Sequence, residues 1–102
     1  MLETFTANTF TPYIDGTFRV FPNSPSPVDL VLTSVTEMQS SYRGGPGAAQ
    51  RTPFSIIFRG PMNAFLPQQI YPMEHSEIGA FEIFLVPIGP DSGGMQYEAV
   101  FN

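Results

Sequence analysis

Few residues of this chain are of the types that perform chemistry, and the first of them is the single histidine. His75 stands in the sequence EHSE, next to Glu74, Ser76 and Glu77. A serine nucleophile, a histidine base and an acid make a hydrolytic triad, but these residues are sequence neighbours and no nucleophile-elbow motif surrounds any serine. The pattern favours a turn histidine held by local carboxylates. With one histidine and no cysteine, a zinc site of the usual Cys/His kind is excluded.

The second candidate is a pair of carboxylates. Glu82 and Glu98 face the same general direction on two runs that we expect to be adjacent strands, and two carboxylates can hydrolyse a glycosidic bond. Tryptophan, the usual platform for a sugar ring, is absent. Two solvated acids explain the pattern better, so a hydrolase that uses Glu82 and Glu98, or His75, is the least favoured function.

The third candidate is Arg59, which ends the apolar run FSIIFR (54–59) just before a Gly-Pro pair. A buried guanidinium needs a carboxylate partner or a path to solvent, because an unpaired buried charge is costly. If the C-terminal strand lies beside this run, Glu98 is the expected partner, with Glu82 second. We therefore predict a structural ion pair between Arg59 and Glu98 that fixes the strand register, and Arg59→Ala should lower the melting temperature.

The stretch SSYRGGPGAAQR (40–51) contains glycines and arginines, as phosphate-binding loops do. It lacks the G-x-x-x-x-G-K-S/T spacing, the chain has no lysine, and no helical pattern follows. We interpret it as a flexible loop that a partner orders. Tyr and Arg are enriched among the residues that dominate protein interfaces, so Tyr42, Arg43 and Arg51 are the candidate partner-binding residues.

Composition narrows the classes of partner. The 102 residues suffice for one domain, and ten Phe and four Tyr supply a core without disulfides. Nine acids against four arginines give a net charge of −5, and an acidic chain without a basic cluster is not expected to bind nucleic acid or an anionic membrane surface. No run approaches the length of a membrane span and the N-terminus lacks the signal-peptide pattern. We therefore expect a protein of the cytoplasm or of an assembled particle.

Short alternating runs of apolar residues predict strands, and eleven prolines and nine glycines separate them. No apolar stripe with helical spacing survives between these breaks. The predicted strands lie at 17–21, 28–35, 54–59, 80–86 and 95–101, with a weaker sixth at 69–73 that Pro72 would confine to an edge or a bulge.

Turn-forming sequences connect these runs. PNSPSP (22–27) is a proline-spaced turn, PIGPDSGG (87–94) is a longer hairpin loop, and HSEIG (75–79) is one helical turn or a tight bend. The spacings predict a single all-β domain over residues 1–102, a small antiparallel barrel or sandwich of five to seven short strands. The flexible loop at 40–51 interrupts it.

The second half of the chain resembles a family of bacterial proteins of about this length that is known only as a domain of unknown function. The resemblance rests on PFSIIFRGP (53–61), LPQQIY (66–71), HSEIG (75–79), FLVPIG (84–89) and YEAVFN (97–102). The first half matches loosely, through FTPYIDGTFRV (10–20). The motif has no established catalytic residues. It suits fold maintenance, with Gly60 and Gly79 in turns and with Tyr71, Phe84, Tyr97 and Phe101 in a core.

Members of this family are often encoded beside proteins with phage tail-collar domains. The resemblance therefore implies a structural or assembly role near a tail-like or fibre-like particle. We expect a non-catalytic structural or adaptor subunit that acts through protein–protein contacts, by self-association or with a tail-collar-like protein, and that needs no cofactor or metal. Open edge strands flanked by prolines are compatible with that role. The alternative is a small-molecule or glycan binding module, with a cleft lined by Tyr13, Tyr42 and Tyr71.

Overall fold

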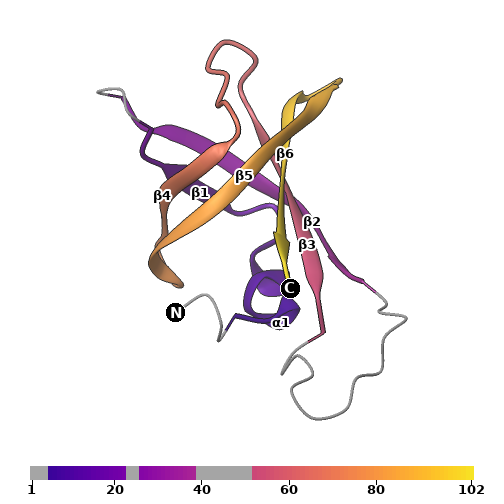
Figure 1. Ribbon diagram of the computed structural model, residues 1–102. Coiled ribbons are helices and arrows are strands. Elements are labelled where there is room, and N and C mark those ends of the chain that lie inside the picture. The colour runs from indigo at the N-terminus through magenta and orange to yellow at the C-terminus, as the bar shows by residue number, and fades with distance from the viewer. Residues whose placement is uncertain (1–4, 23–25, 39–51) are drawn as a thin grey trace.

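The computed structural model describes residues 5–22, 26–38 and 52–102, and these residues form six antiparallel strands that close into one ring (Figure 1). Hydrogen-bonded neighbours follow the order β1-β2-β3-β6-β5-β4 and return to β1. The prediction of a small all-β barrel is confirmed, with a strand at each predicted position. The strands are β1 (Thr17–Val20), β2 (Val28–Glu37), β3 (Phe54–Gly60), β4 (Gln69–His75), β5 (Gly79–Asp91) and β6 (Gly94–Phe101).

Alternation along the strands fills the barrel. In β3, Phe54, Ile56 and Phe58 are buried, whereas Ser55 and Ile57 between them are half-buried on the outer side. Successive side chains of a strand point to opposite faces, so each strand sends every second residue into the core. The largest fully buried side chains include Phe18, Leu30, Leu32, Tyr71, Leu85 and Tyr97.

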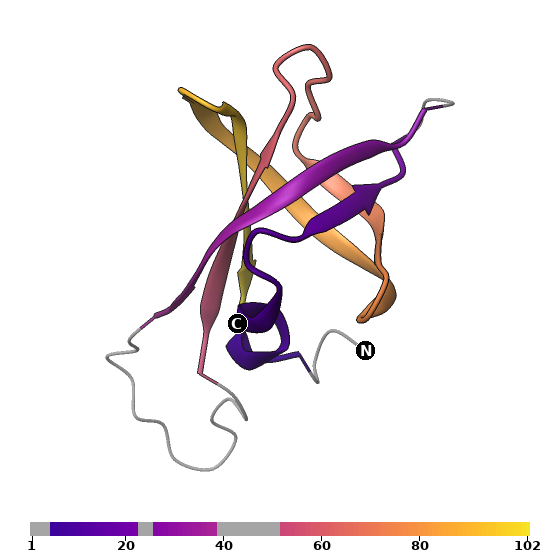
Figure 2. The same ribbon diagram turned by 180° about the vertical axis from the view of Figure 1, so that it is seen from behind.

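A short helix that the sequence analysis did not predict closes the end of the barrel drawn at the bottom of Figure 1. α1 (Ala7–Phe10) continues into the 3-10 turn η2 (Thr11–Tyr13), and both views place α1 near the C-terminal end of β6 (Figures 1 and 2). Phe10 is fully buried, with its ring centroid 5.5 Å from that of Phe101 and 6.0 Å from that of Phe54. Four residues are too few to show a helical stripe, so packing stabilises this helix. Among the described residues, no helix has the length and apolar content needed to cross a membrane.

The hairpin of β5 and β6 is longer than predicted. Most of the stretch 87–94 belongs to strands, because β5 continues to Asp91 and β6 begins at Gly94 after a turn at 92–93. The register shifts between Pro87 and Gly89, and such a bulge accommodates prolines that cannot donate to the ladder. Gly89 and Gly94 have φ angles of +117° and +148°, which favour glycine.

Pro72 does not lie on an edge strand of the ring, so the predicted edge position is wrong. Its strand, β4, pairs with β5 on one side and with β1 on the other. The carbonyl of Pro72 accepts a hydrogen bond from the amide of Phe21, directly after β1 ends. The missing amide of Pro72 therefore falls where the short ladder between β1 and β4 stops, and it costs no strand pairing.

The two glycines expected in turns differ. Gly79 follows the tight turn after β4, with a φ of +98°, as predicted. Gly60 is instead the last residue of β3 and is buried. A Cβ at Gly60 would come within 2.5 Å of a terminal methyl carbon of Leu30 and 3.4 Å of the ring of Tyr97. Gly60 is therefore a packing residue that lets the strands approach.

Candidate functional site

Arg59 forms an ion pair, but with Asp91 and not with Glu98. Its Nη2 donates to the Asp91 carboxylate at 2.8 Å and its Nε donates to the same carboxylate at 3.2 Å. The amide of Gly93 also donates to Asp91, at 2.8 Å. Hydrogen bonding to Asp91 raises the pKa of Arg59, and the hydrogen bonds from Arg59 and Gly93 lower the pKa of Asp91.

The predicted partner was wrong because the hairpin is longer than expected. In the register of β3 and β6, Arg59 lies opposite Gln96, whereas Glu98 lies opposite Ile57. The extended β5 brings Asp91 to the hairpin tip, where a Cβ on Gly93 would come within 2.8 Å of the Arg59 side chain. Arg59 therefore packs across the tip and holds it against β3, which is a structural role.

His75 is a structural turn residue. The residue is 9% exposed, and its ring contacts the rings of Tyr13 and Phe18, with centroid distances of 4.5 Å and 4.4 Å. Its Nδ1 accepts hydrogen bonds from the amides of Glu77 and Ile78, at 3.0 Å and 3.3 Å. The turn is as tight as predicted, but backbone amides hold the imidazole where carboxylates were expected.

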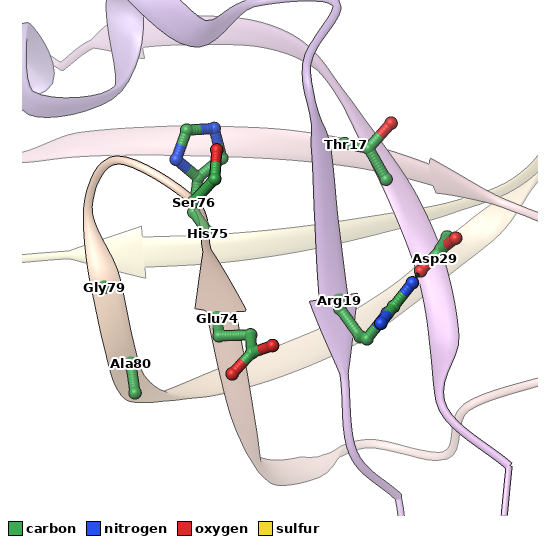
Figure 3. A pocket seen from close by; sticks show the side chains of 8 residues that line it. All are labelled: Thr17, Arg19, Asp29, Glu74, His75, Ser76, Gly79 and Ala80. Carbon is green, nitrogen blue, oxygen red and sulfur yellow. Dashed lines mark hydrogen bonds and ion pairs between the residues drawn. The ribbon is translucent and has the colours of Figure 1, made fainter.

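A polar hollow of about 390 Å³ opens beside His75 (Figure 3). Arg19 of β1 lies opposite Asp29 on β2 and opposite Glu74 on β4. Its Nε donates to Asp29 at 3.1 Å, and Figure 3 shows the guanidinium turned toward Asp29 and away from Glu74. The hollow could hold a small polar molecule. No group of three metal-binding side chains occurs in the described ranges. The lining residues are Thr17, Arg19, Asp29, Glu74, His75, Ser76, Gly79 and Ala80.

The structure separates the two carboxylates considered for hydrolysis. Glu82 lies opposite Pro72 on β4, whereas Glu98 lies opposite Val86 on β5. Val86 is four residues from Glu82, which amounts to about 13 Å along a strand. The carboxylate pairs of glycosidases are about 5–9.5 Å apart, so this arrangement does not match that chemistry.

The predicted aromatic cleft does not form around Tyr71. Tyr71 is buried in the core, and its hydroxyl donates to the carbonyl of Pro67. Tyr13 is half-buried against His75. Tyr42 lies outside the described residues, as do Arg43 and Arg51 of the predicted partner-binding loop.

Large apolar side chains instead gather on the outside of the barrel, over β4 and β5. Ile70 and Phe84 lie opposite each other on these strands and are 62% and 48% exposed. Pro72 projects from the same face of β4, two residues from Ile70, and exposed Phe21 lies beside it. We call Phe21, Ile70, Pro72 and Phe84 the outer apolar face. The motif-based placement of Phe84 in the core was wrong.

The loop between β3 and β4 extends this face at one end of the barrel. Phe65 in this loop is 57% exposed and lines an apolar hollow of about 330 Å³ together with Pro22, Pro67 and others. The loop is fixed from inside, because the buried amide of Leu66 donates to the Tyr97 hydroxyl at 2.9 Å. Phe65 is therefore held near the β4 end of the outer apolar face.

Comparison with known proteins identifies a family and no function. No curated protein and no solved structure matches the chain. The model of a family described as a domain of unknown function, DUF6916, matches residues 5–101. That match spans nearly every residue described above, including both strands of the outer apolar face. The chain therefore belongs to the DUF6916 family.

Proposed function

We propose that this chain is a non-catalytic structural or adaptor subunit that binds another protein through its outer apolar face. The observation that carries the proposal is the pair Ile70 and Phe84, two large apolar side chains opposite each other on the outside of a closed barrel. Single exposed apolar residues are common, but adjoining ones mark interaction surfaces. Phe21 and Pro72 extend the pair into a continuous face.

Covering this face gains about as much free energy as one interface hot spot contributes. Burial of a large apolar side chain contributes about 1.5–3 kcal/mol, and Ile70 and Phe84 are each about half buried already. Covering both therefore yields roughly 2–3 kcal/mol, comparable to an interface hot spot. Most of the strand backbone in the ring is paired on both sides, so side chains of the barrel wall carry most of such an interface.

The family resemblance indicates the kind of partner. It implies a neighbourhood with phage tail-collar-like proteins, which favours a place in a tail-like or fibre-like bacterial assembly. In such an assembly the chain either associates with itself or connects two other subunits. A chain in which 13% of the residues are charged is compatible with burial between subunits, because interfaces are depleted in Lys and Glu.

The first test is the mass of the purified protein by light scattering after size exclusion, over a roughly hundredfold range of concentration. A discrete oligomer that dissociates in Ile70→Ser and Phe84→Ser supports a self-assembling subunit. The matched control is Val31→Ser, which removes an exposed apolar side chain from β2. Each variant must retain the wild-type melting temperature.

If the protein is a strict monomer, the second test measures its binding to a tail-collar-like protein used as bait. Binding that falls about tenfold in Ile70→Ser and is unchanged in Val31→Ser supports the adaptor role. A monomer that does not bind this bait refutes the proposal, and so does binding that is insensitive to Ile70.

The polar hollow supports a second candidate function, the binding of a small molecule. Glu74 is exposed on its rim with no basic partner among the described residues, because Arg19 pairs with Asp29. A ligand with an ammonium group fits that carboxylate. Calorimetric titration with free amino acids and amino sugars tests the idea. Binding that Glu74→Gln does not weaken would rule it out.

A further inference from the structure

The wall of the barrel is incomplete between β5 and β6. Pairing of these two strands runs from the hairpin turn only as far as Val86 opposite Glu98. The first half of β5, residues 79–85, pairs with β4 on one side. The last residues of β6, 99–101, pair with β3. Both views show the two strands diverging below this point (Figures 1 and 2).

The direction of the free backbone groups follows from the hydrogen bond between Phe21 and Pro72. Because the Pro72 carbonyl points toward β1, the backbone groups of Tyr71 and Met73 point toward β5. They bond there with Ile83 and Phe81, which lie opposite them.

Backbone groups alternate in direction along a strand. The amide and carbonyl groups of Ala80, Glu82 and Phe84 therefore point away from β4, toward the side where β5 has no strand in the described part of the chain. Such a row of free groups is a template for an added strand.

The side chains along this edge define what could be added. Glu82 and Phe84 project outward and are exposed, and Glu82 has no basic partner among the described residues. On the inner side, Phe81 remains 7% exposed and contacts the ring of Phe5 at a centroid distance of 5.3 Å. A strand that fits has apolar residues facing Phe81 and, on its outer face, a basic residue beside Glu82.

A second copy of the chain fits poorly. Two antiparallel copies of the edge overlap fully only when their centres coincide, and the centre is Glu82. Each Glu82 would then lie directly opposite the other, and like charges in that position are destabilising. The net charge of −5 adds to this repulsion and favours a basic segment instead.

We propose that the free edge of β5, Ala80–Phe84, accepts an added strand from a protein partner whose extended segment alternates apolar and basic residues. This inference rests on the proposed function, because it assigns the mode of docking next to the outer apolar face. Phe84 belongs to both, so the docked segment would extend onto that face. Main-chain hydrogen bonds would give the affinity, and Glu82 would set the charge preference.

The test uses a blocked seven-residue peptide of alternating lysine and valine as the probe, with amide exchange followed by NMR on the full chain. At a peptide concentration of about ten times Kd, the amides of Ala80, Glu82 and Phe84 should exchange about tenfold more slowly. The amide of Ile83, already bonded to β4, should be unaffected. A peptide with N-methylated lysines, the residues whose amides would face β5, cannot complete the ladder and should give no protection.

Two variants test the edge itself. Glu82→Pro removes an amide that faces away from β4 and should abolish protection while the ladder to β4 remains. If that variant does not fold, Glu82→Lys serves instead, and it should shift the preference from the lysine peptide to a peptide with glutamate in place of lysine. A preference that is unchanged in Glu82→Lys overturns the proposal.

Three further results would overturn the docking mode. These are equal protection by the N-methylated peptide, protection of other strands only, and protection that appears with protein concentration alone. The last result would identify a second copy as the occupant. Loss of partner binding in Ile70→Ser with no peptide effect at β5 would leave the proposed function standing and remove only this inference.

Discussion

The hydroxyl of Tyr97 supports the loop that presents Phe65, and its removal by Tyr97→Phe is the sharpest test of the barrel's interior. Leu66 is 2% exposed, and its amide donates to the Tyr97 hydroxyl at 2.9 Å. Phenylalanine keeps the ring and leaves this buried amide without an acceptor. The expected loss is about 1–3 kcal/mol of unfolding free energy, or roughly 5–20 °C in melting temperature for a domain of this size.

Tyr71→Phe is the matched control, because it removes a hydroxyl from the same end of the core. The Tyr71 hydroxyl donates to the carbonyl of Pro67, an exposed residue whose carbonyl can bond water instead. The expected loss is therefore smaller, about 0.5–1 kcal/mol. Urea unfolding, followed by the far-ultraviolet circular dichroism of the strands, measures both losses. Equal losses of unfolding free energy in the two variants, or no loss in Tyr97→Phe, would refute the conclusion that the buried Leu66 amide depends on the Tyr97 hydroxyl.

Alkaline pH gives an independent check on the same two residues. Burial raises the pKa of Tyr71 and of Tyr97, and the donation from Leu66 offsets only part of the effect on Tyr97. A raised folded-state pKa contributes stability that is complete below the unfolded value, about 10, and is lost as the pH rises through the folded value. The double variant Tyr71→Phe/Tyr97→Phe should therefore lose less unfolding free energy than the wild type between neutral and strongly alkaline pH.

Three further pairs of variants test the ion pair at the hairpin tip, two glycines and the histidine at the turn. The pKa of Asp91 is lowered, so the stability that Asp91 contributes should be present above the usual pKa of about 4 and lost as the pH falls through the lower folded value. Acid unfolding of Asp91→Asn and of Arg59→Ala should lack this pH-dependent loss of stability. Gly94→Ala should prevent or severely weaken folding, because a Cβ would collide with the Gly60 carbonyl oxygen. Gly79 has a positive φ but open space around it, so Gly79→Ala should lower the free energy of unfolding by about 1 kcal/mol, measured by thermal unfolding. His75→Leu should destabilise the protein by about 1–3 kcal/mol in urea, because two turn amides lose their acceptor, and His75→Asn should recover part of that loss.

The fold could be predicted from the sequence because alternation and turn residues are local signals. In AFEIFLV the spacing alone places Phe81, Ile83 and Leu85 on one face and Phe84 on the other, and the structure agrees. The family motif placed Phe84 in the core, because an aromatic residue in a motif suggests packing. Here the two-residue alternation of the strand predicted the position of Phe84 correctly, and this alternation is the signal that could have identified the outer apolar face.

The partner of Arg59 could not be predicted because it depends on where a hairpin turns. PIGPDSGG contains so many turn-forming residues that a long loop was the natural prediction. The bulge between Pro87 and Gly89 lets the strand continue, and this brings Asp91 to Arg59 in place of Glu98. Helix α1 was missed for a different reason, since Phe10 stabilises it by contacts with residues distant in sequence.

The number of strands explains why the binding surfaces that we propose lie on the outside of this barrel. Barrels of about eight strands are just wide enough to be filled by side chains or to hold one small ligand, and a ring of six is narrower. Tyr71 and Tyr97 accordingly fill the interior. On the outside, Arg19 and Arg59 are each paired with an aspartate, whereas Glu82 has no basic partner in the described residues. The partner that we propose would therefore bring apolar side chains and positive charge together, and it would approach over β4 and β5.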